Sequence, residues 1–145
     1  NKKYFNIIKF RSMITDAENE TGPVWSDLED SRITKVGKIL RRLHLDETPQ
    51  LINILKGEMS VVGPRPERPY FIKKLIKEYP FYQRRLKIRP GITGWAQIKQ
   101  PFDTTLKDVR QKLKFDFYYI ENLSFRLDVK IIINTVWVVF WGHSR

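Results

Sequence analysis

The chain has 145 residues, a length typical of a single domain with a modest core. Its 27 Lys and Arg residues against 16 Asp and Glu residues give a net charge of +11, which predicts anionic partners: nucleic acid, acidic lipid headgroups or phosphorylated substrates. The absence of cysteine excludes a disulfide framework and thiolate metal sites. No apolar run reaches the roughly 18 residues expected of a membrane-spanning helix.

The first predicted element is a strand over residues 5–13. Ile8 and Phe10 alternate with Lys9 and Arg11, so the apolar and basic side chains would lie on opposite faces. Lys9 and Arg11 could bind a diphosphate, or they could form an ordinary solvent-exposed strand face. The pattern leaves both interpretations open.

A helix is predicted next, because Val36, Leu40 and Leu43 recur at helical spacing. Arg41 and Arg42 would then lie on its last turn. This places basic groups directly before the acidic pair that follows.

Two adjacent carboxylates, Asp46 and Glu47, follow that helix. Thr48 is a good N-cap residue and Pro49 suits the first helical position, so a second helix is predicted to begin there and to stop at Gly57. A helix N-terminus favours the anionic form of a carboxylate and also attracts phosphate. The pair could serve a catalytic site, although Asp-Glu before a helix is more often a solvated N-cap.

A short strand over residues 58–62 is predicted to lead into a loop in which Arg65 stands between two prolines. Each proline restricts the backbone, so the Arg65 guanidinium is expected on a stiff loop, where it could form a fork for phosphate. The alternative is a simple turn. Paired acids, a helix terminus and a held arginine together suggest phosphoryl chemistry assisted by a hard cation.

An amphipathic helix is predicted over residues 72–79, where Pro80 would end it. Residues 88–97 are predicted to form turns, because they combine Pro-Gly and Thr-Gly pairs. They end near Trp95, whose ring would either pack against the core or serve as a platform for a sugar.

Another helix is predicted to begin at residues 104–105, with an apolar stripe along one face. The stripe consists of Leu106, Val109, Leu113, Phe117 and Ile120. Asp116 lies at the edge of this stripe, and burying a carboxylate without a partner is costly. From the pattern alone it is either one half of a salt bridge with an arginine or part of the functional site.

The last predicted element is a very apolar helix that Ser124 caps and that ends near Trp141. It is too short to span a bilayer. Its tryptophans fit a membrane–water boundary, whereas its aliphatic residues fit a buried core helix.

Seven short stretches then form an ordered set across nearly the whole chain: Lys9–Met13, Asp30–Thr34, Leu45–Leu51, Leu55–Ser60, Gly63–Glu67, Arg89–Gln97 and Asp116–Tyr119. Each stretch is weakly specific alone. In this order they resemble the bacterial sugar transferase family, the monotopic phosphoglycosyl transferases that start glycan assembly on a polyprenyl phosphate.

The resemblance implies an α+β fold: a mostly helical single domain with a few short strands, membrane-associated and of the monotopic type. Residues 1–145 would form the catalytic domain. Family members carry a membrane-entering segment ahead of the stretch matched by Lys9–Met13, so a catalytic core that lacks this segment is expected. The family works at the cytoplasmic face of the bacterial inner membrane.

The resemblance also implies a reaction. A sugar-1-phosphate would pass from a nucleotide diphosphate sugar to polyprenyl (undecaprenyl) phosphate, as the first step of exopolysaccharide or related glycan assembly. Asp46 would be the nucleophile and form a covalent intermediate. Glu47 would help to hold Mg²⁺, and Asp116 would support that ion or the acceptor site. Four basic residues would neutralise phosphate charge: Arg41, Arg65, Lys9 and Arg11.

The chain departs from the family's commonest pattern at two places. After Gln97, many members continue with Asn-Gly-Arg, whereas this chain has Ile98-Lys99-Gln100. His44 stands where small hydroxyl residues are common, and the sequence offers no physical reason for it.

Two other classes of function remain open. A basic nucleic-acid-binding module would fit the charge, but the chain has no recognisable binding motif, so no nucleic acid is expected as a partner. A non-catalytic scaffold at an anionic membrane surface would tolerate loss of Asp46.

Overall fold

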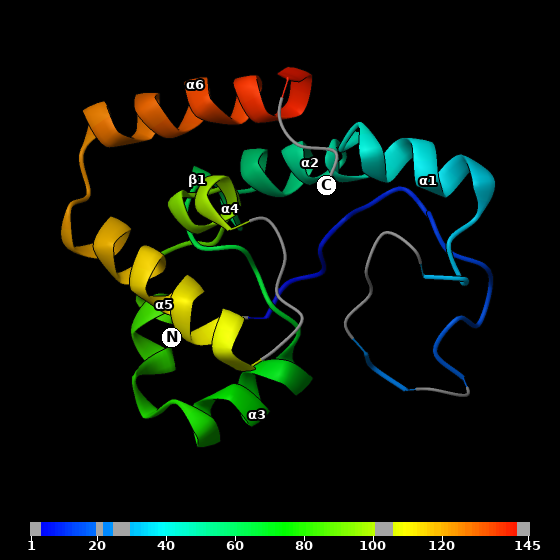
Figure 1. The fold of residues 1–145 in the computed structure, drawn as a ribbon, viewed down its shortest axis with the longest axis horizontal. Coiled ribbons are helices and arrows are strands. Elements are labelled where there is room, and N and C mark those ends of the chain that lie inside the picture. Colours follow the sequence, from blue (N-terminus) through cyan, green and yellow to red (C-terminus); the bar gives the residue numbers. More distant parts are fainter. Residues whose placement is uncertain (1–3, 20–21, 25–29, 101–105, 142–145) are drawn as a thin grey trace.

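The computed structural model describes residues 4–19, 22–24, 30–100 and 106–141 (Figure 1). Helices dominate this part of the chain. The α-helices are α1 (Lys35–Arg42), α2 (Gln50–Leu55), α3 (Pro69–Glu78), α4 (Trp95–Lys99), α5 (Leu106–Glu121) and α6 (Phe125–Trp141). The 3₁₀ helices are η1 (Leu45–Glu47) and η2 (Pro80–Lys87), and the strands are β1 (Ser60–Val62) and β2 (Gly91–Thr93). The predicted α+β, mostly helical single domain is therefore confirmed.

The two strands pair in parallel, with Ser60 opposite Gly91 and Val62 opposite Thr93. The chain between them passes through α3 and η2. The backbones come very close where β1 ends, because a Cβ atom on Gly91 would overlap the backbone nitrogen of Gly63. This close approach fixes the start of the Pro-Arg-Pro loop against β2.

The core consists of two clusters of buried apolar residues, to which the C-terminal half of the chain contributes most. In the first, Phe71 and Leu75 of α3 pack with Tyr82, Val109 and Leu113. The second joins three buried residues: Val62 of β1, Tyr119 of α5 and Ile131 of α6. Figure 1 shows α4 and β1 between α5 and α6, and α3 on the far side of α5 from α6. Helices α3 and α5, which the apolar spacings predicted, are therefore confirmed.

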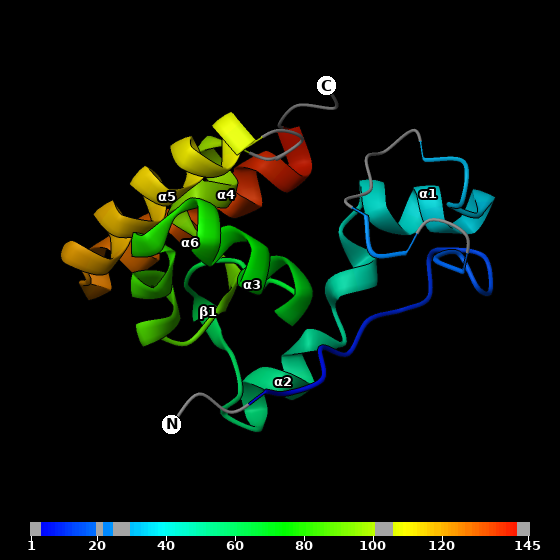
Figure 2. The ribbon, with the colours of Figure 1, turned by 90° about the horizontal axis from the view of Figure 1, so that it is seen from below.

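The predicted strand over residues 5–13 is wrong. This N-terminal arm runs in extended form beside α1 and α2 (Figure 2), and only Met13 makes a bridge, with Ile33. Its backbone instead bonds to helical segments: the Phe10 amide donates to the Asp46 carbonyl at 3.0 Å. Gly37 of α1 lets the arm approach, because a Cβ atom there would overlap the Ser12 carbonyl. The alternation is present in the sequence, but no strand among the described residues lies beside the arm to pair with it.

The acidic pair does not lie where the capping signals predicted. Asp46 and Glu47 belong to η1, and α2 begins only at Gln50. Thr48 is helical itself, and its hydroxyl donates to the Leu45 carbonyl at 2.9 Å instead of capping α2. The predicted stop is confirmed, because Gly57 takes a φ of +74° directly after the last turn.

Residues 88–97 contain β2 and the first part of α4, so the prediction of turns alone was wrong. Both elements are only a few residues long, and their existence depends on tertiary contacts that local spacing does not encode. The predicted helix start at residues 104–105 lies outside the described part of the chain.

The last helix, α6, is present as predicted, and Ser124 caps it by accepting a hydrogen bond from the Leu127 amide at 3.4 Å. Both interpretations of its apolar residues hold in part. Ile131 is completely buried, whereas Ile133 and Trp137 are more than half exposed. In the described part of the chain, every helix is too short or too polar to cross a membrane.

Candidate active site

Glu47 is the centre of the cluster of charges that sequence analysis predicted. Arg65 donates to both of its oxygens, NH1 to Oε2 at 3.2 Å and NH2 to Oε1 at 2.5 Å. Lys9 of the N-terminal arm donates to Oε1 from the other side at 3.0 Å. Three segments far apart in the sequence, the arm, η1 and the Pro-Arg-Pro loop, therefore meet at this carboxylate.

The two cations keep Glu47 ionised although it is only 9% exposed. Burial alone would raise the pKa of Glu47, but the charge and hydrogen bonds of Arg65, and then those of Lys9, outweigh burial and lower the pKa to about 2. Burial likewise would lower the pKa of Arg65, but Glu47 raises it, with smaller contributions from Glu67 and Asp46. Glu47 and Arg65 therefore form a charged pair at neutral pH.

Asp46 lies beside this cluster and is also buried, with 8% of its surface exposed. The turn that presents it starts at His44, which takes the left-handed φ of +54° that few residues other than glycine, asparagine, aspartate and histidine tolerate. The left-handed backbone therefore explains why a histidine is tolerated at position 44, which the sequence alone did not explain. The arm holds the other end of the turn through the bond from Phe10 to the Asp46 carbonyl.

Asn53 of α2 fastens the arm next to the site, and sequence analysis missed it. The side chain is fully buried. Its Oδ1 accepts from the Ile8 amide at 3.1 Å, and its Nδ2 donates to the Asn6 carbonyl at 2.9 Å and to Glu58 at 2.7 Å. An amide in the middle of the apolar run Leu51–Leu55 was the available signal. Asn53 therefore places Lys9 within reach of Glu47.

The other two predicted basic residues have different surroundings. Arg41 lies on the last turn of α1, as predicted, and its Nε donates to the Ser12 hydroxyl at 2.9 Å. This bond connects the helix before the acid pair to the arm. Arg11 is exposed on the same arm. The structure thus brings Lys9 and Arg65 directly onto Glu47, with Asp46 next to it in the chain.

Asp116 has a different environment from the acid pair. It is 2% exposed, and its Oδ2 forms an ion pair with Nε of Arg85 at 3.0 Å. The salt bridge that sequence analysis left open is therefore present. Among the residues that the structure describes, no group of three or more His, Cys, Asp or Glu side chains is arranged to hold a metal ion.

Trp95 of α4 packs against α5 on one face and borders a cavity. Its ring stacks on Tyr118 with centroids 5.7 Å apart, and the amino groups of Lys99 and Lys130 lie 5.0 and 5.4 Å from its centroid. A cavity of about 70 Å³ opens beside these residues and α6. The ring is thus a packing residue on one side and borders a basic cavity on the other.

Comparison with known proteins gives a consistent result. The family model described as bacterial sugar transferase matches residues 1–142. The chain is 45% identical, over 97% of its length, to the UDP-N-acetylgalactosamine-undecaprenyl-phosphate N-acetylgalactosaminephosphotransferase of Aeromonas hydrophila, of which it covers 33%. It is 41% identical to the undecaprenyl-phosphate glucose phosphotransferase of Komagataeibacter xylinus, over 94% of this chain and 26% of that protein.

A third relative is shorter. The exopolysaccharide production protein PSS of Rhizobium leguminosarum is 41% identical over 94% of this chain, which covers 70% of that protein. The chain therefore spans about a third or less of the first two relatives and more than two thirds of this one.

Proposed function

Because the chain belongs to the bacterial sugar transferase family, we propose that it transfers a sugar-1-phosphate from a nucleotide diphosphate sugar to undecaprenyl phosphate. The product would start the assembly of an exopolysaccharide or a related glycan. The observation that carries the proposal is the buried Asp46–Glu47 pair, which two cations from distant segments surround. The names of the relatives support the reaction class, and because they differ in the sugar, we propose no particular sugar.

Asp46 is the nucleophile in this proposal. A carboxylate oxygen of Asp46 attacks the phosphorus that carries the sugar, a new O–P bond forms, and the bond to the bridging oxygen breaks. The nucleoside monophosphate leaves with that oxygen. A phosphate oxygen of undecaprenyl phosphate then attacks the same phosphorus and releases the Asp46 carboxylate. The covalent step divides one hard displacement into two easier ones.

The neighbouring residues stabilise charge. Arg65 and Lys9 border the acid pair and would neutralise phosphate oxygens as the transition state forms, with Arg41 and Arg11 as further basic groups nearby along the chain. Two adjacent carboxylates fit Mg²⁺, which takes one or two protein carboxylates and otherwise water and substrate phosphate. Glu47 and Asp46 would hold the ion, which would supply further neutralisation of the diphosphate. Asp116 is paired with Arg85, so we assign the ion to the acid pair, where Glu47 would exchange one of its contacts with Lys9 or Arg65 for the metal.

The proposed place of action is the cytoplasmic face of the bacterial cell membrane. Helices α1, α2 and α6 lie along the same edge of the molecule (Figure 1). Exposed apolar side chains on α1 and α2 support a membrane contact here: Val36, Ile39, Leu43, Leu51, Ile52 and Leu55. The acid pair lies between these two helices in the chain, so the contact would bring it to a lipid-borne acceptor.

The proposal is tested with the intact protein in membranes, a panel of nucleotide sugars labelled in the sugar, and undecaprenyl phosphate. Without acceptor, label should remain on the denatured wild-type protein and map to Asp46; with acceptor, it should move to lipid. The Asp46→Asn variant keeps the shape of the side chain but is a far poorer nucleophile, so it should retain no label and make no product. Full turnover by a folded Asp46→Asn protein would contradict the role of Asp46, and no transfer from any nucleotide sugar would contradict the reaction.

A further inference from the structure

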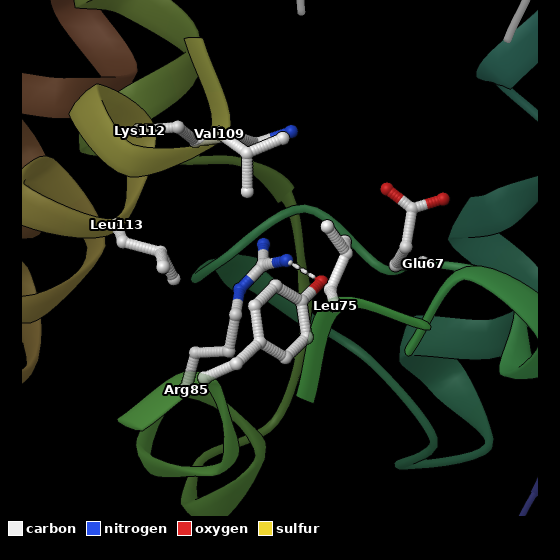
Figure 3. Close-up of a pocket in the computed structure, with 7 residues that line it drawn as sticks. Glu67, Leu75, Arg85, Val109, Lys112 and Leu113 are labelled. Atoms are coloured by element: carbon white, nitrogen blue, oxygen red, sulfur yellow. Dashed lines mark hydrogen bonds between the residues drawn. The ribbon is translucent and has the colours of Figure 1, made fainter. Parts of the chain in front are cut away.

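Arg85 is the most enclosed cation described in the structure, at 4% exposure, and it lies apart from the acid pair. Its NH1 donates to the Tyr82 hydroxyl at 2.5 Å, and its Nε pairs with Asp116 at 3.0 Å. Its NH2 donates to the backbone carbonyl of Arg65 at 2.8 Å. The two terminal nitrogens thus donate hydrogen bonds, whereas Nε contacts the Asp116 carboxylate as an ion pair without the geometry of a hydrogen bond. Figure 3 shows the group among Leu75, Val109 and Leu113.

The carbonyl that Arg85 holds belongs to the residue that grips Glu47. The loop is fixed at two successive carbonyls: the Gly91 amide donates to that of Pro64 at 3.0 Å, and Arg85 donates to that of Arg65. Fixing the peptide groups around a Cα atom also fixes the direction in which its side chain leaves. The Arg65 side chain is about 40% exposed, so packing alone does not fix its direction, and the contact with its backbone adds a restraint.

We propose that Arg85 is a positioning residue for the active site, which aims Arg65 at Glu47 by holding the Arg65 carbonyl, and that Asp116 serves the site through Arg85. The contact with the Arg65 backbone stands on the geometry alone. Its consequence for catalysis rests on the function proposed above.

Arg85 cannot contact a substrate directly, because the space beside it is too small for one. The cavity that it borders, with Glu67, Leu75 and Lys112, has a volume of about 10 Å³, enough for a single water molecule (Figure 3). A nucleotide or a lipid phosphate cannot enter. The described contacts of Arg85 with the site therefore pass through the Arg65 backbone.

Stability alone does not explain why Arg85 and Asp116 are charged residues. Two buried charges lose their hydration, and well-packed apolar residues of similar volume are often as stable or more stable. Apolar residues, however, cannot donate to a peptide carbonyl. Arg85 supplies that donor in the buried interior, and Asp116 balances its charge, so orientation of the loop accounts for the pair.

The experiment separates orientation from stability in the intact protein. The double variant Arg85→Met, Asp116→Leu removes both charges together, so neither is left buried without its counter-charge. It also removes the donor to the Tyr82 hydroxyl and to the Arg65 carbonyl, so some loss of melting temperature is expected and is matched against that of a control. Arg85→Lys is the second variant: it keeps a cation for Asp116, but one ammonium nitrogen cannot occupy the positions of both Nε and NH2. Val109→Ala removes packing from the same core but none of the polar partners of Arg85, and serves as the control for lost stability.

Two measurements are made on each variant. Hydrogen exchange at the amides of Arg65, Glu67 and Arg68 reports on the loop and does not depend on any activity. Both Arg85 variants should exchange faster there than Val109→Ala does. In transfer assays, kcat should fall by about tenfold to a hundredfold with a smaller change in KM, because misplacement affects the transition state most.

A double-mutant cycle then tests whether the effect passes through Arg65. In an Arg65→Ala background, the double replacement of Arg85 and Asp116 should cause no further loss of kcat, whereas a purely structural role would give additive losses. Unchanged exchange in the loop, or additive losses, would overturn the proposal. If the wild type transfers no sugar phosphate, the proposed function fails by itself, while the exchange data still decide whether Arg85 anchors the loop.

Discussion

Arg65 and Glu47 are 18 positions apart in the sequence, and the guanidinium of one donates to both carboxylate oxygens of the other. The stiff Pro-Arg-Pro loop thus delivers a fork, as the prolines predicted, but in this structure the fork faces a carboxylate of the protein itself. A guanidinium has five N–H donors, of which two serve Glu47, so an incoming phosphate would meet a group that is already oriented. The pair therefore couples the loop to the acidic turn.

Replacing this fork by a point charge should be costly. Arg65→Lys keeps the charge but loses the two parallel hydrogen bonds, and we expect kcat/KM to fall by about tenfold or more, which corresponds to about 1.4 kcal/mol. Arg68→Lys is the matched control. Arg68, three residues further along the chain, also donates two hydrogen bonds to one carboxylate, at 2.5 and 2.9 Å, but its partner is Glu18 and not Glu47. Equal kinetics for the Arg65 and Arg68 variants would reduce Arg65 to a turn residue.

Glu47 should make the stability of the fold depend on acid. Its pKa in the folded state, about 2, lies below the ordinary value of 4.5. A carboxylate with a lowered pKa contributes its full stability above its unfolded-state pKa and loses it as the pH falls through the folded-state value. The contribution should therefore decline between about pH 4.5 and pH 2.

The measurement compares the free energy of unfolding of the wild type with that of Glu47→Gln. The difference should be on the order of 3 kcal/mol at most near pH 6 and should shrink towards pH 2. Asp30, whose pKa is also about 2 because Arg32 donates to it, titrates equally in both proteins and cancels. A difference that stays constant from pH 6 to pH 2 would mean that the ion pairs of Glu47 do not stabilise the fold.

Asn53 should matter for stability and, through the arm, for the site. Asn53→Ala leaves the Ile8 amide, the Asn6 carbonyl and Glu58 without their buried partner, so we expect a loss of about 1–3 kcal/mol or more in the free energy of unfolding. Asn122→Ala is the control, since Asn122 also donates to a backbone carbonyl, that of Tyr118, but is exposed. Similar small losses in both variants would show that the arm is not anchored through Asn53.

Sequence analysis predicted the long elements because their packing is periodic. The spacings around Leu75 and Leu113 gave α3 and α5, since a helix that covers a core must repeat apolar residues on one face. The same reasoning failed for the arm around Lys9 and for β2, whose conformations depend on partners distant in sequence. A period of two indicates an extended backbone, but it does not reveal whether a strand lies alongside.

The candidate site was predictable in its residue types and not in its connections. Asp46, Glu47 and Arg65 stood out because charged residues flank helix ends and prolines. Nothing local could indicate that Lys9 reaches Glu47, because a fully buried asparagine on another helix holds the arm there. Asp116 shows the same limit: the stripe predicted its burial, but its partner Arg85 came from a short 3₁₀ helix, η2, that the sequence did not predict.

A membrane contact of the edge formed by α1, α2 and α6 would have two separable components. The net charge of +11 would attract anionic headgroups, each well-placed Lys or Arg contributing about 1 kcal/mol. The exposed apolar residues would add a contact that salt does not screen. We therefore expect the 145-residue chain to bind anionic vesicles more tightly than neutral ones, and high salt to remove only part of this binding.

Substitutions on that edge separate the apolar component from charge. Leu51 and Leu55 of α2 are 54% and 87% exposed, and Trp137 of α6 is 60% exposed. Changing these three residues to alanine should weaken vesicle partitioning by at least about tenfold, since burying one such side chain contributes about 1.5–3 kcal/mol. Phe81→Ala is the matched control, because Phe81 is 72% exposed but belongs to η2, outside that edge. Equal partitioning of the triple variant and the control would place the membrane contact elsewhere, and a wild-type chain that ignores anionic vesicles at low salt would remove it from residues 1–145.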